Sequence, residues 1–124
     1  MNQPLSASLP TPGFAITITR ETEFHVGTLI VEDEDGNYEP IGHALNINEA
    51  EELSQADVQH RRKLLAKGDD AGLCPYYYKL WARGLDGAHR IAATFDEDGN
   101  LLAFGAAGLP PLRNRRVPQP TTGD

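Results

Sequence analysis

The chain has only one cysteine, Cys74, among its 124 residues. A single cysteine cannot form an internal disulfide, so covalent crosslinks do not hold the fold and nothing marks an oxidising compartment. A chain of this length can bury a hydrophobic core without such crosslinks. We therefore expect one domain whose stability comes from packing.

Long apolar runs are also missing. No stretch approaches the roughly 18 apolar residues that a membrane-spanning helix needs, and residues 1–12 contain neither a base nor an apolar segment of signal-peptide length. These absences predict a protein without membrane association, and they predict the cytoplasm as its location.

Basic residues are scarce in the first half. Residues 1–59 carry eleven acids and only Arg20 as a base, whereas residues 60–124 carry ten Lys/Arg and seven acids, for a formal net charge of −7. Such polarity could give the folded protein an acidic and a basic face. The overall negative charge disfavours nucleic acid as the partner, because affinity for it comes largely from neutralising phosphates.

Metal and cofactor motifs are lacking as well. The acidic turns do not fit a calcium loop, because aligning the loop glycine with Gly36 or Gly99 puts Val31 or Thr94 at the first ligand position. No two His or Cys residues stand at zinc-chelating spacing, and no glycine-rich phosphate loop occurs. The sequence thus predicts no cofactor and no metal.

Catalysis has little support in this sequence. A small hydrolase would have to use Cys74 as its nucleophile and His25, His43 or His89 as the base. Nothing in the sequence brings these residues together, and we name no catalytic residue. The enzyme therefore remains an alternative, and a binding module is favoured.

The most informative feature that is present is a repeated pentapeptide. Asp-Glu-Asp-Gly-Asn occurs at 33–37 and again at 96–100, each time between apolar runs. Asp-Gly is a strong signal for a two-residue type I′ hairpin turn, since Gly adopts φ > 0 without strain. A third Asp-Gly, at 86–87, predicts another hairpin. These turns predict the following cross-strand pairs: Thr28/His43, Ile30/Ile41, Val26/Leu45, Tyr78/Phe95, Leu80/Ala93, Ala82/Ile91, Trp81/Ala92, Arg83/Arg90, Ala93/Phe104 and Phe95/Leu102.

The fold class follows from periodicity around these turns. Alternating apolar residues predict a first strand over Phe14–Arg20, ahead of the two hairpin strands. Asn46–Lys67 reads as one helix, which begins at a capping pattern of either Asn46 with Glu49 or Asn48 with Glu51 and ends before Gly68. We predict an α+β fold of order βββ-α-βββ, in which one helix packs on antiparallel sheet, with the six strands in one sheet or in two small packed sheets. A single domain (14–107) lies between a 1–13 tail and a Pro/Arg-rich 108–124 tail. Its helix would bury an apolar stripe made by Ala50, Leu53, Ala56 and Leu64, with His60 inside it.

One surface merits a functional interpretation. The predicted register places an aromatic and basic set on the sheet face opposite the core, namely Tyr77, Lys79, Trp81, Arg83 and Arg90. Aromatics with Arg can anchor a protein partner or a second copy of the chain, which is the favoured interpretation. The same face could stack on nucleobases as an alternative, or its aromatics could simply pack beneath the helix or a tail. In the C-terminal tail, Leu-Pro-Pro-Leu-Arg (109–113) hints at a polyproline ligand, although its proline spacing does not form a PxxP motif.

Overall fold

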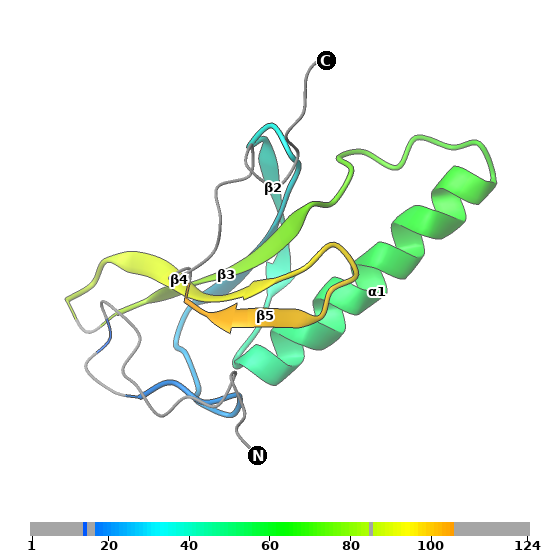
Figure 1. Cartoon of the computed structure of the whole chain (residues 1–124). Coiled ribbons are helices and arrows are strands. Elements are labelled where there is room, and N and C mark those ends of the chain that lie inside the picture. The colour runs from blue at the N-terminus through cyan, green and yellow to red at the C-terminus, as the bar shows by residue number, and fades with distance from the viewer. Residues whose placement is uncertain (1–13, 15–16, 85, 106–124) are drawn as a thin grey trace.

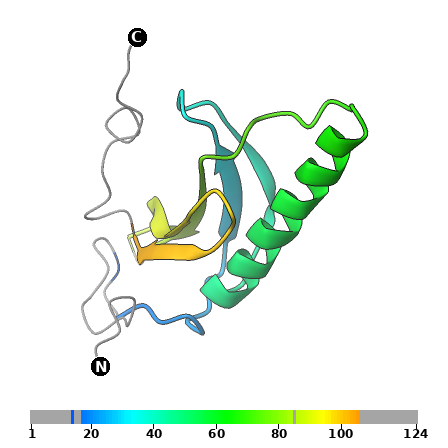
Figure 2. The same cartoon turned by 45° about the vertical axis from the view of Figure 1, so that its right-hand side comes forward.

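The computed structural model describes residue 14, residues 17–84 and residues 86–105. They form a single five-stranded antiparallel sheet of order β2-β1-β3-β4-β5, and one helix lies along one face of it (Figure 1, Figure 2). The elements are β1 (Gly27–Glu32), β2 (Tyr38–His43), α1 (Ile47–Ala66), β3 (Tyr77–Arg83), β4 (His89–Phe95) and β5 (Leu101–Phe104). The predicted α+β class, with one helix on antiparallel sheet, is confirmed. The two predicted tails lie outside the described residues.

The first predicted strand, Phe14–Arg20, is not a strand where it is described, so the observed order is ββ-α-βββ. The Thr19 amide donates to the hydroxyl of Thr22 at 2.8 Å, and the Arg20 carbonyl accepts from an amide at the start of α1. These backbone groups are used by a local turn and by the helix, so they do not form a ladder. Ile18 is nevertheless fully buried in the core, as the alternation predicts.

Both copies of the pentapeptide form the same turn, and it differs from the predicted one. The Asp33 amide donates to the Asn37 carbonyl at 2.8 Å, and the Gly36 amide donates to the Asp33 carbonyl. The Asp33 carboxylate also accepts from two amides inside the turn, which stabilises a three-residue loop. Gly36 has φ 89°, as the final residue of such a loop requires. Residues 96–100 repeat these bonds.

The longer turns change the strand register near each turn, and a bulge in each hairpin then changes it back. Pairs far from the turns are therefore confirmed: Thr28/His43, Tyr78/Phe95, Leu80/Ala93 and Ala93/Phe104. Pairs between a bulge and its turn are wrong: Ile30 faces Pro40, Trp81 faces Ile91, Ala82 faces Arg90, Arg83 faces His89 and Phe95 faces Leu101. The Val26/Leu45 pair falls beyond the ladder.

Helix α1 begins and ends as the sequence predicts. The Asn46 side chain accepts from the Glu49 amide at 2.8 Å, and the Glu49 carboxylate accepts from the Leu45 amide. At the other end, Gly68 has φ 79°, its amide donates to Leu65, and the next amide reaches back to the Leu64 carbonyl. This is a Schellman ending, which satisfies the last carbonyls.

The buried side of α1 differs from the predicted stripe. Its buried residues are Ile47, Ala50, Ser54, Val58 and Arg61, whereas Leu53 and His60 are exposed. They pack on the inward-facing residues of the sheet, which include Leu29, Val31, Tyr78, Leu80, Ala93 and Phe95. Of the predicted stripe, Ala50 is buried and Leu64 is partly buried, but Leu53 and Ala56 are exposed. The prediction also missed Ser54 and Arg61, because a search for apolar residues passes over a buried serine and a buried arginine.

Arg61 can be buried because its guanidinium is fully paired. It donates to Asp57 at 2.6 Å and to Glu39 at 3.1 Å, and also to the carbonyls of Ala71 and Leu73 in the loop before β3. The Tyr78 hydroxyl donates to the same Asp57 carboxylate at 2.7 Å. One cluster thus joins α1, β2, β3 and the connecting loop.

The two identical turns have different surroundings. The β4–β5 turn packs on α1: Arg62 pairs with Asp98 at 2.6 Å, Gln55 donates to Asn100, and the Leu101 amide donates to Glu51. The β1–β2 turn lies at the same end of the strands but at the opposite edge of the sheet, and a β-carbon on its Gly36 would approach only Glu32 within 4 Å. Only the β1–β2 turn therefore keeps its glycine away from the helix.

Candidate functional site

The sheet face opposite α1, called the outer face below, carries the candidate site. Successive residues of a strand point to opposite faces, and Tyr78 and Leu80 point to the helix. Lys79 and Trp81 therefore point outward. Because β1 pairs directly with β3, Thr28 lies beside Trp81, and the outward residues of the two central strands form one surface.

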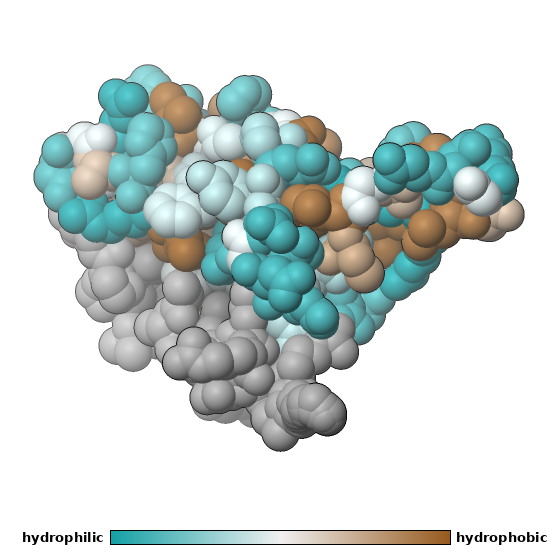
Figure 3. Space-filling model, turned by 90° about the horizontal axis from the view of Figure 1, so that it is seen from above, coloured by the Kyte–Doolittle hydropathy of each residue, from teal (hydrophilic) through white to brown (hydrophobic). Residues whose placement is uncertain are grey.

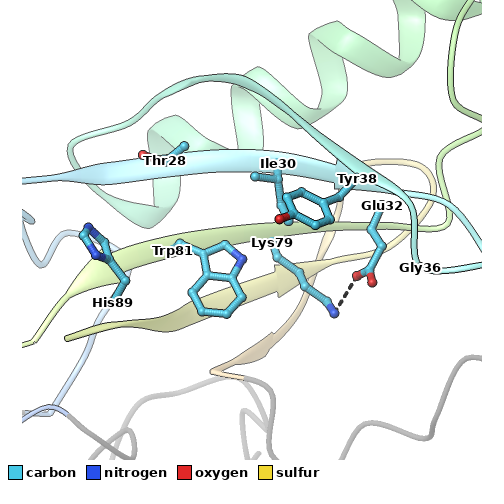
Figure 4. Close-up of a pocket in the computed structure, with 8 residues that line it drawn as sticks. All are labelled: Thr28, Ile30, Glu32, Gly36, Tyr38, Lys79, Trp81 and His89. Atoms are coloured by element: carbon cyan, nitrogen blue, oxygen red, sulfur yellow. Dashed lines mark ion pairs between the residues drawn. The ribbon is translucent and has the colours of Figure 1, made fainter.

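A pocket of about 480 Å³ opens on the outer face. Its lining comes from the four strands β1 to β4 and from the β1–β2 turn, and consists of Thr28, Ile30, Glu32, Gly36, Tyr38, Lys79, Trp81 and His89. Figure 4 shows Trp81 between His89 and Lys79, with Ile30 and Tyr38 across from it. We call this the outer-face pocket. Its volume lies in the range of small-molecule and peptide side-chain sites.

The only lysine in the pocket is already neutralised. Lys79 pairs with Glu32 at 2.6 Å, and both side chains are mostly buried (Figure 4). The ammonium also lies 5.6 Å from the centre of the Tyr77 ring, at a distance where a cation is attracted to the ring face. The pair gives one end of the pocket a polar wall without net charge.

Trp81 supplies the pocket with a hydrogen-bond donor. Its indole nitrogen Nε1 is shielded from solvent and has no acceptor among the described residues. A buried donor without a partner is unfavourable by roughly 1–3 kcal/mol. An acceptor on a bound molecule would remove that cost. The pocket therefore combines aromatic and aliphatic walls with one donor that needs a carbonyl or carboxylate.

Three of the five predicted site residues come together. Lys79 and Trp81 line the pocket, and Tyr77 lies beside it, 2% exposed and in contact with Lys79 and Tyr76. Arg83 is outward-facing and exposed at the end of β3, and it does not line the pocket.

Arg90 does not belong to this face. The β4 bulge pairs it with Ala82, whose side chain faces α1, and puts His89 on the outer face in its place. Arg90 instead forms a two-pronged ion pair with Asp86 at 2.7 Å. Its guanidinium and the Ala88 amide lower the pKa of Asp86, and the carboxylate in turn raises the pKa of Arg90. The prediction that Arg83 and Arg90 oppose each other is wrong for the same reason.

Sequence reasoning missed the β1 and β2 side of the pocket. Alternation along the strand places Thr28 and Ile30 on a common face. Nothing in the sequence, however, says that β1 lies beside β3. Tyr38 follows the first Asp-Gly turn and is 66% exposed, which is unusual for a large aromatic. The one signal of this exposure in the sequence is that Tyr38 directly follows the turn residues Gly36 and Asn37.

Histidines and Cys74 form no comparable site in the described part of the chain. A second hollow of about 300 Å³ is lined by His25, Val26, Gly27, His43, Ala44, Leu45 and Glu49. Cys74 is exposed in the loop before β3 and lines neither hollow. His43 and His89 are both exposed. Among the described residues, no group of three His, Cys, Asp or Glu side chains could hold a metal ion.

The face seen from the top of Figure 1 is mostly hydrophilic where it is described, and its apolar side chains appear in separate patches (Figure 3). Of the exposed large hydrophobic residues, only Tyr38 lines the outer-face pocket. The described helix is too polar to span a membrane.

Comparison with known proteins adds no relative: no family model, no curated protein and no solved structure matches this chain.

Proposed function

We propose that this protein is a binding module, and that the outer-face pocket takes an extended segment of a protein partner. The observation that carries this proposal is the buried indole N–H of Trp81, which lacks an acceptor and lies among aromatic and aliphatic walls. An extended segment offers a backbone carbonyl to that donor and apolar side chains to Ile30 and Tyr38. Trp and Tyr are enriched among the residues that carry most of the binding energy at protein interfaces.

The predicted cationic residues support a protein partner over nucleic acid. Lys79 is paired with Glu32, and Arg90 is paired with Asp86 and lies on the opposite side of the sheet. Arg83 is the exposed arginine of the outer face, and it lies outside the pocket. Phosphate binding depends on cations that can exchange their counterions for the nucleic acid backbone. An outer face whose lysine is neutralised by an internal carboxylate offers little of this attraction.

The cytoplasm is the proposed location, because the single cysteine is an exposed free thiol, and a reducing compartment preserves such a group.

Self-association through the same pocket is the second form of the proposal. In that case the extended segment would belong to another copy of this chain.

Selection from a displayed library of twelve-residue peptides on the full chain tests the proposal. Trp81 is the only tryptophan, so its fluorescence reports directly on the pocket. We expect selected peptides to change that fluorescence on binding. Labelled copies of the same peptides should bind at least tenfold more weakly to Trp81→Phe, which keeps an aromatic ring and loses the donor.

Two further variants sharpen this test. Tyr38→Ala removes an exposed wall of the pocket and should also weaken binding about tenfold, while Arg83→Ala, outward-facing on the same sheet but outside the pocket, should bind as the wild type does. Equal affinity of the wild type, Trp81→Phe and Tyr38→Ala for the selected peptides would overturn the proposal, provided that their thermal unfolding shows that all three are folded.

A further inference from the structure

We propose that the outer-face pocket is occupied, in the free protein, by the chain's own C-terminal segment, with Leu-Pro-Pro-Leu at 109–112 as the part that enters it. This inference rests on the proposed function, since it names the ligand class of the same pocket. The ligand class is a polyproline II helix. The segment itself lies outside the described residues.

The chemistry of the pocket fits a polyproline II helix. Such a helix has no internal hydrogen bonds, so its carbonyls are free to accept. Aromatic-lined grooves recognise it because its conformation is set before binding, which lowers the entropy lost on association. Trp81 and Tyr38 provide the aromatic walls, and the Trp81 indole provides the donor.

The chain leaves the sheet at a suitable place. The Gly105 amide donates to the Ala92 carbonyl at 2.7 Å, and Ala92 is next to Ile91, the partner of Trp81. Gly105 is therefore level with Trp81 and two strands away, or about 10 Å at the usual spacing. A polyproline II chain advances ~3.1 Å per residue. The four residues 106–109 can thus span about 12 Å, which is enough to reach the pocket.

The chain is also directed to the correct side of the sheet. Thr94 pairs with Lys79 and so lies on the outer face, where its hydroxyl donates to the Gly105 carbonyl at 3.0 Å. Gly105 itself has φ 69°, a left-handed conformation that ends the strand. The hydrogen bond holds the exit of β5 on the side of the pocket rather than on the side of α1.

Charge favours the same arrangement. The β1–β2 turn borders the pocket through Gly36 and carries Asp33, Glu34 and Asp35. The C-terminal segment has Arg113, Arg115 and Arg116 directly after its proline pair. Opposite charges flanking an apolar contact set the direction in which a polyproline segment lies. With the prolines near Trp81, the arginines can extend toward the acidic turn.

The experiment compares two double variants of the full chain. Pro110→Gly/Pro111→Gly disrupts the segment that we assign to the pocket, whereas Pro118→Gly/Pro120→Gly makes the same chemical change further along the same tail. We expect the first variant to raise the constant for acrylamide quenching of Trp81 at least twofold. The second variant should quench as the wild type does. Quenching that is equal in all three proteins would overturn the inference.

A labelled synthetic peptide of residues 106–124 provides the second measurement. A tail that fills the pocket nine-tenths of the time weakens an added ligand about tenfold. The peptide should therefore bind the Pro110→Gly/Pro111→Gly variant about tenfold more tightly than the wild type. Equal binding to both would overturn the inference, and so would no binding to either. With either of these two outcomes, the proposed function would still be supported if the library peptides bind Trp81→Phe more weakly than the wild type.

Measuring the quenching of Trp81 at two protein concentrations distinguishes a tail from the same chain from the tail of a second copy. A segment bound within its own chain protects Trp81 equally at 1 μM and at 100 μM. Protection that increases with concentration would mean that a second copy supplies the segment, and would overturn the intramolecular form of the inference.

Discussion

Gly99, in the turn between β4 and β5, lies directly against the backbone of Gln55 in α1. A β-carbon at Gly99 would be 2.7 Å from the Gln55 amide nitrogen, a distance that real β-carbons essentially never show. Gly36 occupies the same position in the other copy of the pentapeptide and approaches no helix. The repeated sequence thus serves once as the docking point of the helix and once as a free turn beside the pocket.

This difference predicts unequal effects of one substitution. Gly36 and Gly99 have φ of 89° and 87°, so changing either to alanine incurs the same left-handed strain of about 1 kcal/mol. Gly99→Ala must also push the turn away from α1, which we expect to cost about 1–3 kcal/mol more. Urea unfolding of the two variants measures the difference directly. Gly87→Ala, in a third turn with open space around it, is a second control. Equal losses at 36 and 99 would contradict the observed packing.

The cluster around Arg61 predicts a large loss of stability from a single substitution. Arg61→Met removes the partner of Asp57 from a mostly buried site, where side chains of Arg61 and Asp57 are 9% and 16% exposed. Breaking such a pair costs about 3–5 kcal/mol. The matched control is the next residue: Arg62 pairs with Asp98 in a half-exposed position, so Arg62→Met should lose no more than about 1 kcal/mol. Chemical denaturation of both variants measures the two losses of stability. Similar midpoints for the two variants would argue against a structural role of the cluster.

Tyr78 predicts a loss of stability at alkaline pH. Burial, and then the hydrogen bond to Asp57, raise the pKa of Tyr78 above its ordinary value. The unfolded chain releases this proton near pH 10 while the folded protein keeps it. The contribution of Tyr78 to the free energy of unfolding is thus complete below pH 10 and decreases above it, by up to about 1.4 kcal/mol per pH unit. Unfolding free energies at pH 9, 10 and 11 should fall less steeply for Tyr78→Phe than for the wild type. Tyr38→Phe, at an exposed tyrosine, is the control and should retain the wild-type decline.

The hydrogen bonds of Glu51 predict a contribution to folding stability that is lost in acid. Its carboxylate accepts from Arg20 at 2.6 Å and from the Leu101 amide at 2.8 Å, and so connects α1 to β5 and to the segment before β1. Burial alone would raise the pKa of Glu51, but these bonds outweigh it and lower the pKa. Its stabilisation is therefore present above the unfolded pKa and disappears as pH falls through the lower folded value. Thermal unfolding between pH 2 and pH 7 should show a shallower acid decline for Glu51→Gln. The neighbouring exposed Glu52→Gln should follow the wild type, and identical profiles for both variants would refute this assignment.

Local features of the fold could be read from the sequence because each has a local physical cause. The limits of α1 follow from Asn46, which caps the first turn, and from Gly68, which accepts the left-handed conformation at the end. The three hairpins follow from their Asp-Gly pairs. Even the register is correct far from the turns, since the apolar residues at positions such as Tyr78 and Phe95 must share a buried face.

The site could be predicted only in part, because its residues meet through contacts between strands that are distant in the sequence. Alternation along β3 is enough to place Lys79 and Trp81 on one face. That β1 lies beside β3 is a matter of sheet order, and this order brings Thr28, Ile30 and Glu32 to the pocket. A single bulge moves Arg90 off the face and His89 onto it, because one extra residue in β4 reverses the side of every residue between the bulge and the β3–β4 turn.

The sequence by itself therefore determined the helix, the positions of the three hairpin turns and the direction in which Trp81 points, since these depend on neighbours within a few residues. The tertiary structure alone decided that Arg61 is buried, that Lys79 is neutralised by Glu32, and that one copy of the pentapeptide packs on the helix while the other borders the pocket. Those outcomes depend on which surfaces meet when strands and helix assemble. Identical residues acquire different roles because their surroundings differ.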